Sequence, residues 1–265
     1  NLSIMKKILL PTDFSENSWN AIAYALQLFK NEICEFYLLN AYTPVIYHVE
    51  YVLVNAAKYG LGDAVRENAL KNLDDFKDRM TKSFTNPKHT TKTIAAFNTL
   101  VSEIKEIVEK KKIDYVVMGT KGATGAAEVL FGSNTVHVFK NVNCPILAVP
   151  DAFDFETPHE VLFPTDYEIE YKDYHLKPLL DISSLFNTRV NILNVSKGYD
   201  LSEAQETHKQ VLEKKFEHVT HLFHRVNSKS VAEAITQFQL KSRINLLVMI
   251  NNKHSFFHSS KINKA

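Results

Sequence analysis

The chain has 265 residues, with 31 Lys or Arg and 30 Asp or Glu, so its formal net charge is +1. This balance argues against a dedicated nucleic-acid binder, which carries a basic excess gathered on one face. Hydrophobic residues make up 45% and charged residues 23%, which are ordinary globular proportions and exclude intrinsic disorder. The length suits one large domain or two modest ones.

The setting of the protein is indicated by its cysteines and by its hydropathy. The two cysteines, Cys34 and Cys144, are too few for a disulfide framework and suit a reducing compartment. No stretch approaches the roughly 18 apolar residues of a membrane span, and the first ten residues lack the long apolar run of a secretory signal. We therefore expect a cytoplasmic protein without a membrane partner.

In chain order, apolar strand-like runs alternate with segments of helical periodicity. In the first part, the predicted strands are 6–12, 33–41, 91–97, 114–119 and 144–149, and the predicted helices are 18–30, 61–83, 100–111 and 134–141. Uninterrupted apolar runs such as 115–118 are typical of parallel strands that are covered on both faces. Right-handed crossovers then produce a doubly wound α/β layer.

The second part repeats this scheme. The predicted strands are 160–165, 189–195, 219–226 and 245–250, and the predicted helices are 168–186, 201–217 and 229–242. Three short motifs recur in the same order: 7–13 in 161–166, 38–40 in 192–194, and 112–118 in 243–249. This pattern indicates an internal duplication with about twenty fewer residues in the second copy. We predict two Rossmann-like α/β domains with parallel sheets, 1–150 and 158–265, the second degenerate and without its last strand.

Glycine marks the candidate site. Four of the seven glycines fall between 119 and 132, and glycine serves where a ligand must approach the main chain or where φ is positive. Gly119 is expected at the carboxyl end of the fourth strand, and Pro11, Thr12 and Asp13 at that of the first. In an open parallel sheet, ligands bind beyond these ends, at the switch in strand order.

The glycine-rich segment has the features of a phosphate site. It reads Gly-Thr-Lys-Gly at 119–122, and nine residues later Gly-Ser-Asn at 132–134 begins a helix. The free N–H groups and the dipole of that helix suit a phosphate chain, to which Ser133 and Asn134 can donate. Gly119 and Gly122 would let the main chain pass close to ribose and phosphates, and Asp13 can accept a hydrogen bond from a ribose hydroxyl or an adenine amino group.

Two common phosphate-binding motifs are missing from the sequence. There is no Gly-x4-Gly-Lys-[Ser/Thr] and no Gly-x-Gly-x-x-Gly after a strand. A Walker-type NTPase and a standard dinucleotide dehydrogenase are therefore disfavoured.

The spacing Gly-x2-Gly-x9-Gly-Ser, with Pro-Thr-Asp at the end of the first strand, resembles the ATP-binding class of universal stress proteins. The flanks agree, since Met118 precedes the first glycine and 143–150 matches the closing strand. The resemblance covers the first copy and, more weakly, most of the second, as in tandem members of that family, whose domains belong to the wider adenine-nucleotide α-hydrolase-like fold.

This resemblance implies that the first copy binds ATP, with Mg²⁺ or Mn²⁺ as counter-ion. The adenine would lie against the backbone of Ala41. The full set of nucleotide-binding residues that it implies is Pro11, Thr12, Asp13, Ala41, Met118, Gly119, Thr120, Gly122, Gly132, Ser133 and Asn134. No residue is assigned to catalysis or to direct metal ligation.

The second copy departs from this pattern. It keeps Pro164, Thr165 and Asp166, but 251–254 reads Asn-Asn-Lys-His where the glycines should be. Side chains there would block a close approach to phosphate, so we expect the second copy to be free of nucleotide.

The expected function is that of an ATP-binding stress-response sensor or regulator rather than a turnover enzyme, because no general base, arginine finger or metal-binding aspartate pair is identifiable. The resemblance also implies slow hydrolysis or autophosphorylation, with Ser133 and Thr120 as acceptors. Two alternatives stay open: a nucleotide-independent scaffold, and an adenylating enzyme, against which the lack of a Ser-Gly-Gly loop after the first strand counts.

Simpler interpretations of the same residues stay open as well. The glycine loop can be a tight strand–helix connection, and Asp13 and Asp166 can be turn or N-cap residues. A metal site at His218, His221 and His224 is disfavoured, because alternate side chains of a strand point to opposite faces. Universal stress domains commonly pair through their fifth strands, so the resemblance and the open edge at 144–149 predict a homodimer.

Overall fold

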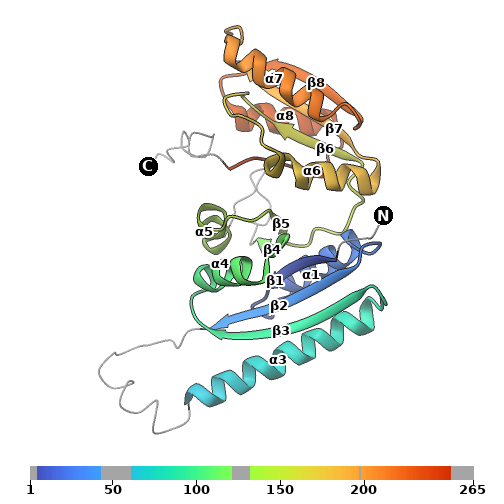
Figure 1. Ribbon diagram of the computed structural model, residues 1–265. Helices are drawn as coiled ribbons and strands as arrows, with labels where there is room; N and C mark the ends of the chain where they lie inside the picture. Colours follow the sequence, from blue (N-terminus) through green and yellow to red (C-terminus); the bar gives the residue numbers. More distant parts are fainter. Residues whose placement is uncertain (1–4, 43–60, 121–131, 197, 252–265) are drawn as a thin grey trace, which may run out of the picture. The chain divides into compact units, whose positions relative to one another are not determined.

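The computed structural model describes residues 5–42, 61–120, 132–196 and 198–251 (Figure 1). The chain divides into two compact units, residues 1–155 and 156–265. Each contains one parallel β-sheet with helices as the crossovers, so the predicted fold class is confirmed. No helix in these described ranges is long and apolar enough to cross a membrane.

The first unit has a five-stranded parallel sheet in the order β3-β2-β1-β4-β5. Its elements are β1 (Lys6–Pro11), α1 (Glu16–Leu28), β2 (Cys34–Tyr42), α3 (Leu61–Ser83), β3 (His89–Phe97), α4 (Leu100–Lys111), β4 (Tyr115–Thr120), α5 (Ser133–Asn141) and β5 (Ile146–Pro150). β1 pairs with β2 on one side and with β4 on the other. The adjacency of the first and fourth strands, which the candidate site requires, is therefore confirmed.

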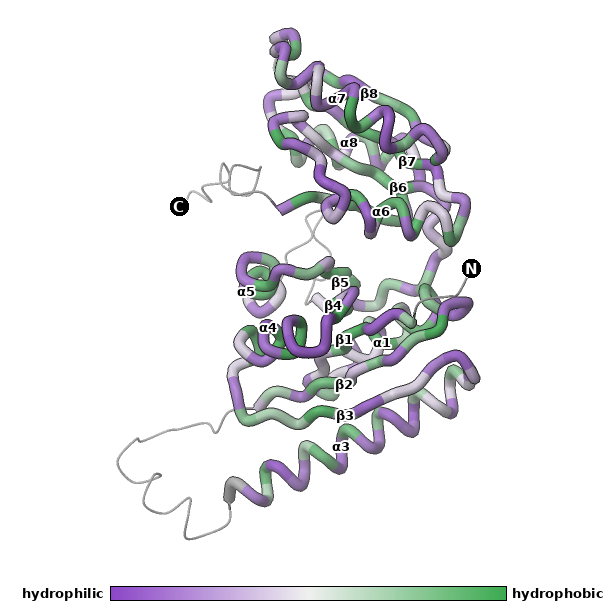
Figure 2. The backbone as a smooth tube through the Cα atoms, in the orientation of Figure 1, coloured by the Kyte–Doolittle hydropathy of each residue, from purple (hydrophilic) through white to green (hydrophobic). Residues whose placement is uncertain are grey.

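The core of the first unit lies on both faces of this sheet. Ile8, Leu9 and Leu10 are fully buried although they point alternately to opposite faces, because helices cover both. Helix α3 alternates hydrophilic and hydrophobic stretches along its length (Figure 2), as expected of a helix that is buried on one side. On that buried side, Leu73 and Met80 pack into the core.

The second unit has a four-stranded parallel sheet in the order β8-β7-β6-β9. Its elements are β6 (Glu160–Pro164), α6 (Asp173–Phe186), β7 (Arg189–Ser196), α7 (Glu203–Lys215), β8 (His221–Asn227), α8 (Val231–Lys241) and β9 (Leu246–Leu247). No further strand follows β9 up to residue 251, where the described part of the chain ends.

Two predictions for the second unit need correction. The helix predicted over 168–186 begins at Asp173, because Tyr167 has a φ of 58° and the chain before the helix buries Tyr167 and Tyr171 instead of winding into a turn of helix. The strand predicted over 245–250 shortens to two residues. Its one described neighbour is β6, so few backbone hydrogen bonds hold it extended.

The two units repeat one local structure where the first strand of each sheet ends. Phe14 and Tyr167, which follow the two Pro-Thr-Asp motifs, both adopt positive φ, 65° and 58°. Asn40 donates a hydrogen bond to the carbonyl oxygen of Thr12 at 2.8 Å, and Asn194 donates one to the carbonyl oxygen of Thr165 at 3.0 Å. The matched motifs therefore occupy matched positions in the two sheets.

Candidate functional site

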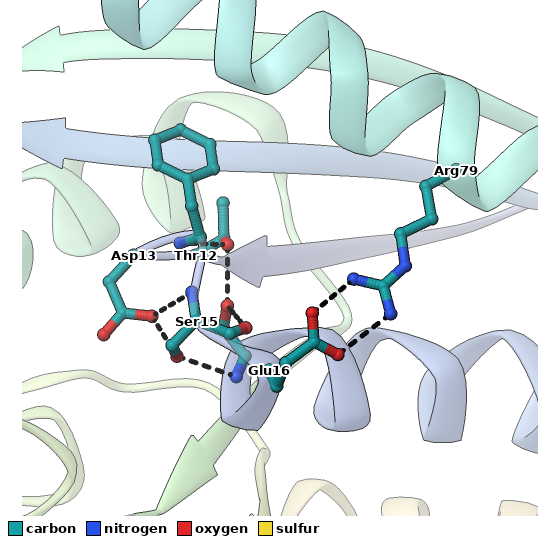
Figure 3. A network of polar contacts seen from close by, with 7 residues as sticks. Thr12, Asp13, Ser15, Glu16 and Arg79 are labelled. Atoms are coloured by element: carbon teal, nitrogen blue, oxygen red, sulfur yellow. Dashed lines mark hydrogen bonds and ion pairs between the residues drawn. The ribbon is translucent and has the colours of Figure 1, made fainter.

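The Pro-Thr-Asp turn of the first unit is held by the side chain of Thr12. Its buried hydroxyl hydrogen-bonds to the Ser18 hydroxyl at 2.8 Å and accepts the N–H of Phe14 at 3.0 Å. These two bonds stabilise the left-handed conformation of Phe14. They leave Asp13 exposed at the carboxyl edge of the sheet, between β1 and α1 (Figure 3).

Asp13 presents a carboxylate at this edge. Its Oδ1 accepts hydrogen bonds from the N–H of Ser15 at 3.1 Å and from the hydroxyl of Ser15 at 2.5 Å. Partial burial raises the pKa of Asp13, but the hydrogen bonds from Ser15 outweigh it and hold the pKa below its usual 3.8. The group is therefore ionised at neutral pH and acts as an acceptor.

Helix α3 is tied to the start of α1 next to this turn. Arg79 donates two hydrogen bonds to Glu16, at 2.7 and 2.9 Å (Figure 3). Its guanidinium lies 3.9 Å from the centre of the Trp19 ring. The bidentate pairing and the stacking orient the arginine from two sides. These contacts fix the first turn of α1 on which the Asp13 turn depends.

Gly119 lies near the end of β4, on the strand next to β1. A Cβ at this position would lie 2.8 Å from the carbonyl oxygen of Asn17 and 2.9 Å from its Oδ1. The missing side chain therefore leaves room for the first turn of α1, a role that the glycine pattern did not predict. The spacing of residues along the chain contained no signal for this role, because Asn17 and Gly119 are far apart in the sequence and are brought together only by the fold.

Two buried polar atoms at this edge lack partners among the described residues. Thr120 is fully buried at 0% exposure, and its Oγ1 makes no hydrogen bond there. The Oδ1 of Asn17 is likewise unpaired. Buried polar groups are usually satisfied, so unpaired ones next to a candidate site are expected to meet a ligand or water.

Helix α5 starts beside β4 without a side-chain cap. Its N-cap is Gly132, whose carbonyl oxygen accepts the N–H of Val136. Glycine has no side chain that could accept hydrogen bonds from the first amides of the helix. The side chains of Ser133 and Asn134 are exposed at this start. The hydroxyl of Thr135 donates to the carbonyl oxygen of Gly119 at 3.4 Å and connects the helix to β4.

The predicted site residues gather in one place. Pro11 ends β1 and Thr12 and Asp13 follow it, Ala41 lies near the end of β2, and Met118, Gly119 and Thr120 end β4. Gly132 caps α5, which begins with Ser133 and Asn134. All of these strand ends belong to the same carboxyl edge of the first sheet. Met118 differs from the others, because its side chain is buried in the core against α4 and α5. Gly122 lies outside the described residues.

The corresponding turn of the second unit is occupied by side chains of the protein itself. The hydroxyls of Thr165 and Tyr171 are hydrogen-bonded, and α7 supplies two further contacts. Gln205 donates to the carbonyl oxygen of Asp166 at 2.8 Å. The Nδ1 of His208 lies 2.8 Å from the carbonyl oxygen of Tyr167. These long-range contacts had no signature in the sequence.

A cluster of metal-binding side chains and a reactive thiol are two features that would support catalysis. In the part of the chain that the structure describes, no group of three or more His, Cys, Asp or Glu side chains could hold a metal ion. Burial raises the pKa of the Cys34 and Cys144 thiols to about 12, so both are protonated at neutral pH and are poor nucleophiles.

Comparisons with known proteins agree with this architecture. The family model described as "Universal stress protein family" matches residues 5–150. Universal stress protein MJ0531 of Methanocaldococcus jannaschii is 31% identical over 147 residues, 56% of this chain and 83% of the relative. Universal stress protein MJ0577 of the same organism is 32% identical over 160 residues, 56% of this chain and 97% of the relative.

The chain also resembles solved structures over most of its length. The crystal structure of a universal stress protein from Archaeoglobus fulgidus covers 92% of this chain and 86% of its own, with a TM-score of 0.64. At 19% sequence identity this likeness shows the fold alone.

Proposed function

The chain belongs to the universal stress protein family, and on that premise we propose that its first domain, 1–150, binds ATP and acts as a stress-response sensor or regulator. The second domain, 158–265, is free of nucleotide. One observation carries the proposal: an ionised, exposed Asp13 lies just beyond the end of β1, while the start of α5, which has no side-chain cap, follows the adjacent strand β4.

The two ends of this edge suit the two ends of a nucleotide. A carboxylate repels phosphate and accepts hydrogen bonds, so Asp13 fits the ribose hydroxyls. The N–H groups at the start of α5, with the Ser133 hydroxyl and the Asn134 amide, fit the phosphates. The Thr120 hydroxyl, which has no hydrogen-bond partner among the described residues, lies at the end of β4. Because the described site residues include no carboxylate pair, Mg²⁺ or Mn²⁺ would be held mainly by the phosphates.

A regulatory role fits this site better than fast turnover. Phosphoryl transfer needs an oriented nucleophile and groups that neutralise the developing charge, and the described site residues supply neither a general base nor an arginine. Slow autophosphorylation would use Ser133, since its hydroxyl is exposed whereas that of Thr120 is fully buried.

The test is calorimetric titration with MgATP of the wild-type chain, Asp13→Ala and the matched variant Asp166→Ala. Asp166 accepts the N–H of Glu168 at 3.0 Å, as Asp13 accepts that of Ser15, so both variants lose a similar local bond. We expect one nucleotide per chain and a loss of affinity of about 10- to 100-fold in Asp13→Ala alone, the value of a hydrogen bond to a charged group.

Other results would contradict the proposal in distinct ways. Two nucleotides per chain would place a second site in the second domain. No binding by the wild-type chain would favour the nucleotide-independent scaffold. Hydrolysis of MgATP near the ~10 s⁻¹ that is typical of enzymes would favour an enzyme instead.

The proposal extends to the oligomeric state. Among the described strands, β5 pairs with β4 alone and forms one edge of the first sheet. We expect a homodimer through the predicted edge strand 144–149, because an unpaired parallel edge is a template for another strand. Sedimentation at micromolar concentration should give a dimer, and Ala148→Pro, which removes a backbone donor, should give a monomer. A wild-type monomer would contradict this expectation.

A further inference from the structure

An aromatic pair, of which one ring is exposed and the other is half-buried, lies at the same carboxyl edge, outside the residues assigned above. Tyr42 and Phe97 are register partners at the ends of β2 and β3. Their ring centres are 5.9 Å apart and the rings are inclined by 64°, an edge-to-face contact. Phe97 is 66% exposed, so much of this aromatic side chain is open to solvent at this edge.

The strand register places this pair close to the Asp13 turn. Pro11, the last residue of β1 before the Asp13 turn, is level with Leu39, and Tyr42 and its partner Phe97 lie three residues further along β2 and β3. Neighbouring strands are about 4.8 Å apart, so β3 lies about 10 Å from β1. A nucleoside whose ribose contacts Asp13 can cover that distance.

The direction of the nucleotide follows from the strand order β3-β2-β1-β4-β5. The phosphate end belongs at α5, beside β4, and the ribose at Asp13 on β1. The base must then extend the opposite way, over the ends of β2 and β3. We propose that it stacks on the ring of Phe97, which is in edge-to-face contact with Tyr42, and that a purine is the preferred base; this inference rests on the proposed function.

Stacking is the interaction that this corner offers, because the neighbouring amide is already used. Asn98 donates from its Nδ2 to the carboxylate of Glu103 at 3.0 Å, and its Oδ1 accepts the N–H of Thr99 at 2.8 Å. It therefore has little left with which to bind the edge of a base. Every base has a π face, and the larger face of a purine covers more of the ring.

The second unit supplies an internal comparison. By the match of Asn40 with Asn194, the position of Tyr42 corresponds to Ser196, whose register partner is Asn227. This pair is polar, and the Ser196 hydroxyl is occupied by the N–H of Gly198 and the carbonyl oxygen of Tyr199. The aromatic pair thus occurs in the unit that carries the ionised Asp13 turn, and its counterpart lacks it.

The test compares Phe97→Ala, Phe97→Leu and Phe97→Trp with the wild type by calorimetric titration with MgATP and, separately, with magnesium tripolyphosphate, which has no base. The control is Tyr199→Ala, which removes an aromatic side chain that is 80% exposed in the second unit. We expect Phe97→Ala and Phe97→Leu to bind MgATP about tenfold more weakly, a loss of about 1.4 kcal/mol. Phe97→Trp and Tyr199→Ala should bind it like the wild type, and tripolyphosphate affinity should not change in any variant.

The outcomes separate this inference from the proposed function. If the wild type binds MgATP and Phe97→Ala binds it equally well, the stacking role is wrong and the proposed function stands. Equal weakening of MgATP and tripolyphosphate would show that Phe97 supports the fold rather than the base, and would also overturn the inference. No MgATP binding by the wild type would overturn the proposed function and the inference with it.

Discussion

Replacing Gly119 with valine should lower the free energy of unfolding of the first unit by about 3 kcal/mol, the upper end of the usual cost of overpacking. The added Cβ would lie 2.8 Å from the carbonyl oxygen of Asn17. That oxygen belongs to the backbone of α1 and cannot rotate away as a side chain could. Urea denaturation followed by the fluorescence of Trp19, the single tryptophan of the chain, reports on α1 directly.

Two variants test whether this clash is the cause. Asn17→Ala combined with Gly119→Val removes the Oδ1 contact but keeps the carbonyl contact, so it should recover only part of the loss. Gly198→Ala in the second unit adds a Cβ that meets no atom within 4 Å, so its only cost is the strain of an alanine at a φ of +97°. It should leave the urea midpoint reported by Trp19 fluorescence unchanged. A Gly119→Val chain as stable as the wild type would show that α1 can shift freely.

The fold follows from the sequence to a large extent, because periodicity and strand order are local or repeated signals. Apolar runs such as 115–118 mark strands that both faces bury, and the duplicated Pro-Thr-Asp motif fixes where each sheet begins. The adjacency of β1 and β4 then follows from doubly wound topology, and the structure confirms it. Most of the candidate site could thus be placed from the sequence.

The rest depends on which segments meet in space, and spacing along the chain does not contain that information. Asn17 contacts Gly119, and Gln205 supports the turn at Asp166, only because the fold brings distant segments together. The exposure of Phe97 likewise depends on which segments pack around it. The late start of α6 has a local cause that a helical pattern hides. Burial of Tyr171 ahead of the helix outweighs another turn of backbone hydrogen bonds.

Replacing Tyr171 with serine should lower the free energy of unfolding of the second unit by about 3–5 kcal/mol, the usual cost of truncating a buried aromatic side chain. Tyr171 is 2% exposed and packs in the core near Phe163. It occupies the position that Ser18 holds in the first unit, and each hydroxyl is hydrogen-bonded to the threonine of its own turn. Hydrogen exchange of the β6 and β7 amides measures the effect in the second unit alone.

Tyr171→Phe separates the ring from the hydroxyl. It keeps the packing, removes one hydrogen bond and leaves the Thr165 hydroxyl as the acceptor for the N–H of Tyr167, so the expected cost is about 1 kcal/mol. Ser18→Ala removes two hydrogen bonds in the first unit, one to the Thr12 hydroxyl and one to the carbonyl oxygen of Ser15, so it should cost about 1–2 kcal/mol. If Tyr171→Ser proves as mild as Tyr171→Phe, the ring does not support the core. If Tyr171→Ser costs clearly more than Tyr171→Phe, the same backbone turn is supported in two ways. The first unit uses the small Ser18 side chain, and the second uses the buried ring of Tyr171.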